Sequence, residues 1–210
     1  MFISFEGIEG LGKTTQLKRL TTYLQEKGIS VVVTREPGGT PMGEEIRDVL
    51  LAHRHEVVAP MTELLLMFAA RAQHVATIIK PALKQGSWVL CDRFVDASYA
   101  YQGGGRGMDL QKIQALETLV LEQFAPDLTF LFDAEPGVGL QRIKGRDGHP
   151  DRFELEKIEF FDRVRAVYQM RAKQNPKRYK VIDAAKPLEE VWGNVKSIMD
   201  IFSTSEEGIK

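Results

Sequence analysis

The stretch that decides the fold is Gly7–Thr14 (GIEGLGKT), which fits the phosphate-binding pattern G-x-x-x-x-G-K-[ST], or P-loop. Its glycines let the backbone turn so that several N–H groups point at one phosphate chain. Lys13 supplies a positive charge for the β- and γ-phosphates, and the Thr14 hydroxyl is a ligand for Mg²⁺. The apolar run Phe2–Glu6 precedes the motif and a helical pattern follows it. The positive end of that helix would face the same anion, so we predict a nucleoside triphosphate site here.

Outward from this motif, short β-rich runs alternate with longer helical patterns, which predicts a parallel sheet covered by helices on both faces. A glycine cluster, Gly103–Gly107, is expected to interrupt the chain, and Ser203–Lys210 is expected to be a frayed tail. We see no dividing linker and predict one α/β domain over residues 1–210. The predicted strands are Phe2–Glu6, Ser30–Thr34, Trp88–Cys91, Leu128–Phe132 and Tyr179–Ile182. The predicted helices are Lys13–Lys27, Gly43–Ala52, Met61–Ile79, a helix capped by Asp109 and ended by Pro126, Glu135–Ile143, Phe153–Gln174 and Pro187–Phe202.

Composition excludes several classes of protein. The chain has 210 residues, with 28 Lys plus Arg against 29 Asp plus Glu, so it lacks the basic excess of a general nucleic-acid binder. The single cysteine, Cys91, excludes an internal disulfide framework and fits a reducing compartment. The N-terminus has no signal-peptide pattern, and the apolar stretch Leu64–Ala70 is too short to cross a bilayer. We expect a cytoplasmic protein that binds neither nucleic acid nor membrane.

Arginines near the predicted strand ends indicate a second anion site. Arg35 ends the second strand, Arg93 follows the third, and Arg71 lies on the helix before it. In doubly wound sheets ligands bind outside the strand carboxyl ends, so these side chains are expected near the P-loop. Asp92, at the end of a buried strand, is a candidate for the Mg²⁺ shell. A small P-loop protein without N-K-x-D is typical of a metabolite kinase. A different nucleotide or deoxynucleoside kinase, or a non-catalytic protein that changes shape with ATP, remains an alternative from these residues alone.

Nearly the whole chain resembles the thymidylate kinase family. The resemblance is carried, in the expected order and spacing, by FEGIEGLGKTTQ, TREPGGTPMGEEIR, LLLMFAARAQH, VLCDRFVDASYAYQGGGRG, PDLTFLFD and RDGHPDRFE. It implies a P-loop NTPase fold with strand order 2-3-1-4-5 and a mobile lid over about residues 144–152. It also implies transfer of the γ-phosphoryl group of Mg-ATP to dTMP, giving dTDP for dTTP biosynthesis, by a homodimer.

The resemblance assigns roles residue by residue. The donor phosphates would be held by Gly7, Ile8, Glu9, Gly10, Leu11, Gly12, Lys13, Thr14 and Thr15. The acceptor nucleotide would be bound by Glu36, Pro37, Phe68, Arg71, Arg93, Ser98, Tyr101 and Gln102. Within this set Phe68 would stack on thymine, Arg93 would hold the acceptor phosphate, and Tyr101 would leave no room for a ribose 2′-hydroxyl. Glu9 would lie near the sugar 3′-hydroxyl, and Thr14 and Asp92 would hold Mg²⁺.

The position of the catalytic arginine separates two branches of the family. The variable positions of this P-loop carry no arginine, whereas the loop 144–152 carries Arg146 and Arg152. The chain therefore resembles the lid-arginine type, in which a cation arrives at the transferring phosphoryl group when the lid closes and water is excluded. One departure from the family is Ala97, where many members have serine.

Overall fold

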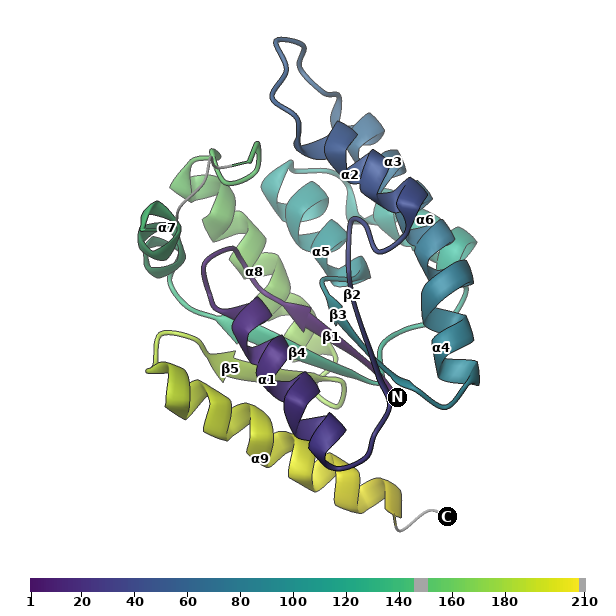
Figure 1. The fold of residues 1–210 in the computed structure, drawn as a ribbon. Helices are drawn as coiled ribbons and strands as arrows, with labels where there is room; N and C mark the ends of the chain where they lie inside the picture. Colours follow the sequence, from purple (N-terminus) through teal and green to yellow (C-terminus); the bar gives the residue numbers. More distant parts are fainter. Residues whose placement is uncertain (146–150, 208–210) are drawn as a thin grey trace.

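One parallel sheet forms the centre of the molecule (Figure 1). The computed structural model describes residues 1–145 and 151–207. Within these residues the strands, in spatial order, are β2 (Val31–Arg35), β3 (Trp88–Asp92), β1 (Phe2–Glu6), β4 (Leu128–Asp133) and β5 (Tyr179–Asp183). Every neighbouring pair is parallel. The predicted strand order 2-3-1-4-5 is confirmed.

Helices cover both faces of the sheet, and the central strands β1, β3 and β4 are accordingly buried on both sides. The helical segments are α1 (Lys13–Glu26), α2 (Pro41–Leu51), α3 (Pro60–His74), η1 (Val75–Ile79), α4 (Lys80–Lys84), α5 (Val95–Ser98), η2 (Tyr99–Gly105), α6 (Leu110–Leu121), α7 (Pro136–Lys144), α8 (Ile158–Gln174) and α9 (Leu188–Glu207). Helices α1 and α9 lie side by side on one face (Figure 1). Successive side chains of β1 point to opposite faces of the sheet. Ile3 and Phe5 belong to one core cluster with Leu20, whereas Phe2 belongs to a second cluster with Phe68.

Two helix boundaries differ by five residues from the sequence predictions, and the other boundaries differ by less. Helix α8 begins at Ile158 rather than Phe153, because Asp151 Oδ1 accepts the backbone N–H groups of Phe153 and Glu154 and fixes a separate turn. Helix α9 continues to Glu207 rather than ending at Phe202, so the predicted frayed tail is helical over residues 203–207. This segment contains no glycine or proline, and extending an existing helix is far easier than starting one. Residues 208–210 lie outside the described part of the chain.

The predicted interruption at the glycine cluster falls later than its first glycine: the helical segment runs on through Gly105, and the chain breaks at Arg106 and Gly107, which has φ 71°. Segment η2 is a π-helix that continues α5 through Gly105 and packs against α8. A Cβ atom at Gly104 would lie 2.6 Å from the backbone oxygen of Arg163, so only glycine allows the two helices to approach this closely. The glycines therefore act in packing here.

Candidate active site

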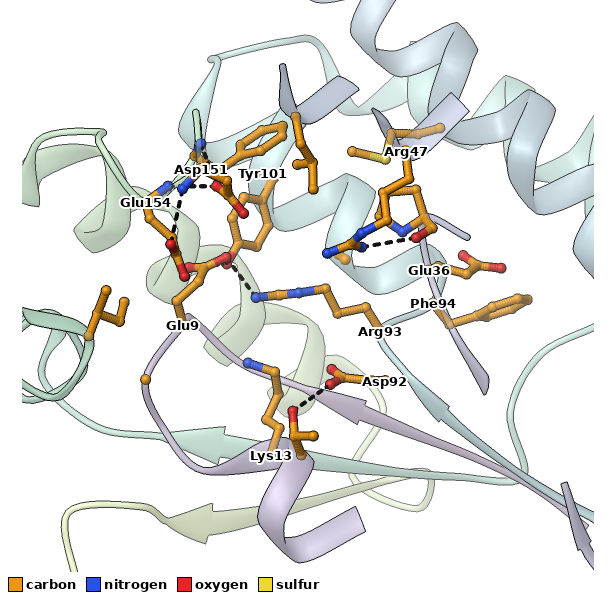
Figure 2. Close-up of a pocket in the computed structure, with 18 of the residues that line it drawn as sticks. Glu9, Lys13, Glu36, Arg47, Asp92, Arg93, Phe94, Tyr101, Asp151 and Glu154 are labelled. Atoms are coloured by element: carbon orange, nitrogen blue, oxygen red, sulfur yellow. Dashed lines mark hydrogen bonds and ion pairs between the residues drawn. The ribbon is translucent and has the colours of Figure 1, made fainter. Parts of the chain in front are cut away.

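The P-loop and the carboxyl end of β3 border a cleft of about 630 Å³ (Figure 2). The loop conformation depends on glycine at its first position. Gly7 has φ 128°, and a Cβ atom there would lie 2.2 Å from the backbone oxygen of Phe132 on β4. Of the predicted donor residues, Glu9, Gly10, Gly12, Lys13, Thr14 and Thr15 line the cleft. The side chains of Ile8 and Leu11 instead pack in the core beneath the loop.

Lys13 lies at the floor of this cleft with its ammonium held by the loop itself. Its Nζ donates to the backbone oxygens of Gly7 at 2.9 Å and Ile8 at 2.7 Å. Burial, with a smaller effect of the charge on Arg93, lowers the pKa of Lys13 to about 8. A polyphosphate placed against this ammonium would favour its charged form, so anion binding and protonation of Lys13 are coupled.

Beside Lys13, two oxygen-bearing side chains meet at the predicted metal position. The Thr14 hydroxyl donates to Asp92 Oδ2 at 3.0 Å, joining the start of α1 to the end of β3. Mg²⁺ takes oxygen ligands and is usually held by one or two protein groups together with substrate phosphates. The donor set present therefore fits this ion.

Arg93 occupies the middle of the cleft, between Lys13 and Arg47, and extends toward Glu9 (Figure 2). Its Nη2 donates to Glu9 Oε1 at 2.8 Å, and its Nη1 donates to the backbone oxygen of Gly7 at 2.9 Å. The Tyr101 ring lies 4.7 Å from the guanidinium, and its hydroxyl is 2.7 Å from each Glu9 carboxylate oxygen. The structure thus brings together three residues that the resemblance assigned to the acceptor sugar and phosphate.

The other end of the cleft contains a buried polar network. Arg71 Nε donates to Glu36 Oε2 at 2.7 Å, and Arg71 Nη1 donates to Ser98 Oγ at 3.1 Å. The second Glu36 oxygen lies 3.0 Å from His74 Nδ1. Because a carboxylate only accepts, Nδ1 is the donor, and the other ring nitrogen, Nε2, lies 2.6 Å from Thr34 Oγ1. Both cleft residues, Glu36 and Arg71, are therefore fixed before any ligand arrives.

Several predicted residues lie elsewhere. Phe68 does not line the cleft: it is 2% exposed, Arg71 covers its ring at 4.7 Å, and Met67 lines the cleft instead. Arg152 is also absent from the residues that line the cleft. Its Nε donates to the backbone oxygen of Leu50 at 3.0 Å. Arg35, expected in the crevice from topology, is exposed and pairs with the half-buried Glu44. Arg146 lies outside the described residues. Pro37, Ser98, Gln102 and Ala97 do line the cleft.

Sequence reasoning missed other residues at the site. Arg47 and Arg142 both contribute to the lining, and each donates to a backbone oxygen, of Pro37 and Ala184 respectively. Both arginines lie on helices that also carry other polar, solvent-exposed residues. No local sequence signal distinguishes the two cleft arginines from these surface residues. The buried carboxylate of Glu63 accepts hydrogen bonds from the side chains of Gln102 and Arg106. No sequence motif around Glu63 predicts this role.

Comparison with known proteins decides among the alternatives that the residues left open. The family model described as thymidylate kinase matches residues 5–195. The chain belongs to the thymidylate kinase family. It is 53% identical to the thymidylate kinase of Pseudomonas putida (strain W619) over 199 residues, which cover 95% of this chain and 96% of that protein. It is 50% identical to the thymidylate kinase of Ruthia magnifica subsp. Calyptogena magnifica, over 96% of this chain and 98% of that one.

A solved structure supports the same assignment. The crystal structure of thymidylate kinase from Ehrlichia chaffeensis superimposes with a TM-score of 0.78 at 39% identity, covering 95% of this chain and 98% of that chain. The family assignment and the fold predicted from the sequence are thereby confirmed. Among the residues that the structure describes, none of the helices combines the length and apolar character needed to span a bilayer.

Proposed function

We propose that this cleft carries out the reaction of the thymidylate kinase family, in which the γ-phosphoryl group of ATP passes to dTMP to give dTDP and ADP. The observation that carries the proposal is the position of Arg93, whose guanidinium lies between the P-loop and the Glu36–Arg71 end of the cleft (Figure 2). A cation there can neutralise an acceptor phosphate while Lys13 neutralises the donor. Phosphoryl transfer needs mainly such positioning and charge neutralisation.

The donor phosphates would lie along the P-loop. Lys13 exchanges its two backbone partners for phosphate oxygens, and the backbone N–H groups at the start of α1 face the same anion. Thr14 and Asp92 would hold Mg²⁺, which would neutralise charge on the donor phosphates. On the acceptor side, Arg93 holds the dTMP phosphate and Glu9 accepts from the sugar 3′-hydroxyl.

The thymine end of dTMP would occupy the other part of the cleft. Arg71 and Ser98 present donors to the base edge, and Gln102 and Pro37 line the same space. Phe68 would reach the base only if Arg71 moved off its ring, so we assign it to support Arg71 from below. Tyr101 occupies the space beneath the sugar.

For Arg152 we propose a change of partner during the reaction. Its guanidinium is paired with the buried Glu63 and would move to the transferring phosphoryl group when the lid implied by the family resemblance closes. Residues 146–150 of that lid lie outside the described part of the chain. Arg146, in the same segment, is proposed as a second donor-side cation. A homodimer and a cytoplasmic location remain predictions from the family resemblance and from composition.

The test is a panel of nucleoside monophosphates with ATP and Mg²⁺, in which ADP release is measured for each acceptor. We expect dTMP to give the highest kcat/KM. Lys13→Ala should lower turnover by at least about 10²-fold while the circular dichroism spectrum stays that of the wild type. A best acceptor other than dTMP, or turnover of the variant within about tenfold of the wild type, would contradict the proposal.

A further inference from the structure

Glu6, the last residue of β1, is a fully buried carboxyl group directly before the P-loop, and it does not line the cleft. Burial, followed by the nearby charge of Asp96, raises its pKa to about 8. A polar group so fully removed from water is costly unless its oxygens are hydrogen-bonded. The partners of the two oxygens therefore indicate what this residue does.

The first oxygen holds the backbone on one side of Arg93. Glu6 Oε1 accepts the backbone N–H of Phe94 at 2.7 Å. The N–H of Arg93 itself donates to the backbone oxygen of Phe5 at 3.0 Å. Between these two bonds Arg93 has φ 69°, a left-handed conformation that is unfavourable for a residue with a side chain. Two consecutive residues of β1 thus hold the turn that directs Arg93 into the cleft.

The second oxygen acts on the side chain of the same arginine. Glu6 Oε2 accepts the hydroxyl hydrogen of Tyr168, on α8, at 2.7 Å. The Tyr168 oxygen in turn accepts from Arg93 Nη1 at 3.2 Å. With its hydrogen committed to Glu6, the hydroxyl presents a lone pair toward the guanidinium. Both ends of Arg93, backbone and guanidinium, are therefore linked to one carboxyl group.

We propose that Glu6 is a positioning residue, which acts with Tyr168 to fix the turn and the guanidinium of Arg93 for the acceptor phosphate. It touches neither substrate, and its effect passes through the Phe94 N–H and the Tyr168 hydroxyl. The proposal rests on the proposed role of Arg93 in holding dTMP. It predicts that disturbing Glu6 weakens the acceptor side of the reaction, whereas ATP binding to the P-loop changes little.

The test compares Glu6→Gln and Tyr168→Phe in the full-length protein. Each variant keeps the volume of the side chain and alters the hydrogen bonding between Glu6 and Arg93. We expect kcat/KM for dTMP to fall at least about tenfold in each, with KM for ATP within about twofold of the wild type. In an Arg93→Ala background the same changes should alter the residual activity by less than about threefold, because residues that act through one another are not additive.

Ser4→Ala is the matched control. Ser4 lies two residues earlier on the same face of β1, is fully buried and shares a hydrogen bond with Thr129. Among the described side-chain hydrogen bonds, none joins Ser4 or Thr129 to Arg93. This variant should lose stability without the selective effect on dTMP. The inference would be overturned if both variants were soluble and kept the wild-type kcat/KM for dTMP. It would also be overturned if kcat/KM fell equally for dTMP and for ATP. If Glu6→Gln does not fold, Tyr168→Phe decides alone. If Arg93→Ala itself leaves kcat/KM for dTMP unchanged, the proposed role of Arg93 fails and this inference with it.

Discussion

Arg71 and Glu36 form an ion pair with 2.7 Å between Nε and Oε2, and both side chains are almost completely buried. The pair joins the segment after β2 to α3 at the acceptor end of the cleft. Burying two charges is costly, and their attraction offsets this cost only while both partners are present. The pair therefore holds Arg71 in place for a ligand but leaves the fold sensitive to loss of either member.

We predict that Glu36→Ala lowers the free energy of unfolding by about 3–5 kcal/mol, because it leaves the Arg71 guanidinium buried without its counter-charge. Urea denaturation followed by circular dichroism measures the change. Arg35→Ala is the control: it removes an ion pair of 2.8 Å that is largely exposed, and such pairs contribute about 0–1 kcal/mol. Equal losses in the two variants would show that burial of the Arg71–Glu36 pair has no special energetic effect.

A second prediction concerns pH and ATP. The pKa of Lys13 in the free protein is lowered to about 8, so the ammonium is mostly charged below this pH and mostly neutral above it. The charged form binds phosphate, and bound phosphate raises the pKa again. The kcat/KM for ATP should therefore fall as the pH rises through about 8, whereas kcat at saturating ATP should fall only at higher pH.

Calorimetry in two buffers of different ionisation enthalpy measures the same coupling directly. At pH 8–9 the wild type should take up protons when ATP binds, with an upper limit of about one proton from Lys13. Lys13→Arg should show no such uptake, since a guanidinium stays protonated throughout this range. An ATP affinity that does not vary between pH 7 and 9, or uptake that persists in Lys13→Arg, would contradict the prediction.

The fold was predictable because its determinants are local and repeated. The P-loop pattern, the β-rich runs and the Asp109 cap, whose side chain accepts the N–H of Gln111, each specify structure over a few residues. The π-helical form of η2 was not predictable, since the glycines that look like a break serve a contact with α8, almost sixty residues away. Long-range packing of this kind has no signature in the local sequence.

The site was predictable in composition and less so in contacts. Motifs identified Lys13, Arg93 and Glu9, which the structure places within one cleft. They could not show that Glu6 lies beneath Arg93, because the link passes through Tyr168 on a distant helix. Nor could they place Arg152, whose partner Glu63 belongs to α3. A short polar motif specifies which groups are present, while tertiary packing decides what each of them contacts.

A third prediction concerns the choice between deoxyribose and ribose. If Tyr101 lies beneath the sugar, dUMP should be used at least about tenfold better than UMP, and Tyr101→Ala should reduce this ratio because the ring is removed. Tyr101→Phe is the control, since it keeps the ring and removes only the hydroxyl near Glu9. It should retain the discrimination while lowering kcat/KM for both acceptors. Equal kcat/KM values for dUMP and UMP in the wild type would refute this role.

The last prediction concerns Arg152, whose Nη2 lies 2.8 Å from Glu63 Oε2 outside the cleft. If Arg152 leaves Glu63 and reaches the transferring phosphoryl group on closure, it contributes mainly in the transition state. Removing such a contact lowers kcat more than it raises KM. We predict that Arg152→Ala lowers kcat by about 10²-fold or more, with KM for ATP changed much less, as measured by steady-state kinetics.

Arg106→Ala distinguishes this role from simple support of Glu63. Arg106 also pairs with Glu63, and it pairs with Glu156 as well, so its removal disturbs the same buried carboxylate without touching Arg152. If Arg152 acts on the phosphoryl group, Arg106→Ala should lose stability but keep kcat within about tenfold of the wild type, far above Arg152→Ala. Equal kcat losses in the two variants would instead mean that Arg152 acts by holding Glu63 and α3 in place. A third outcome is that Arg152→Ala keeps a near-normal kcat and shows a large rise in KM for ATP. That result would mean that the Arg152 side chain binds ATP equally in the ground state and the transition state.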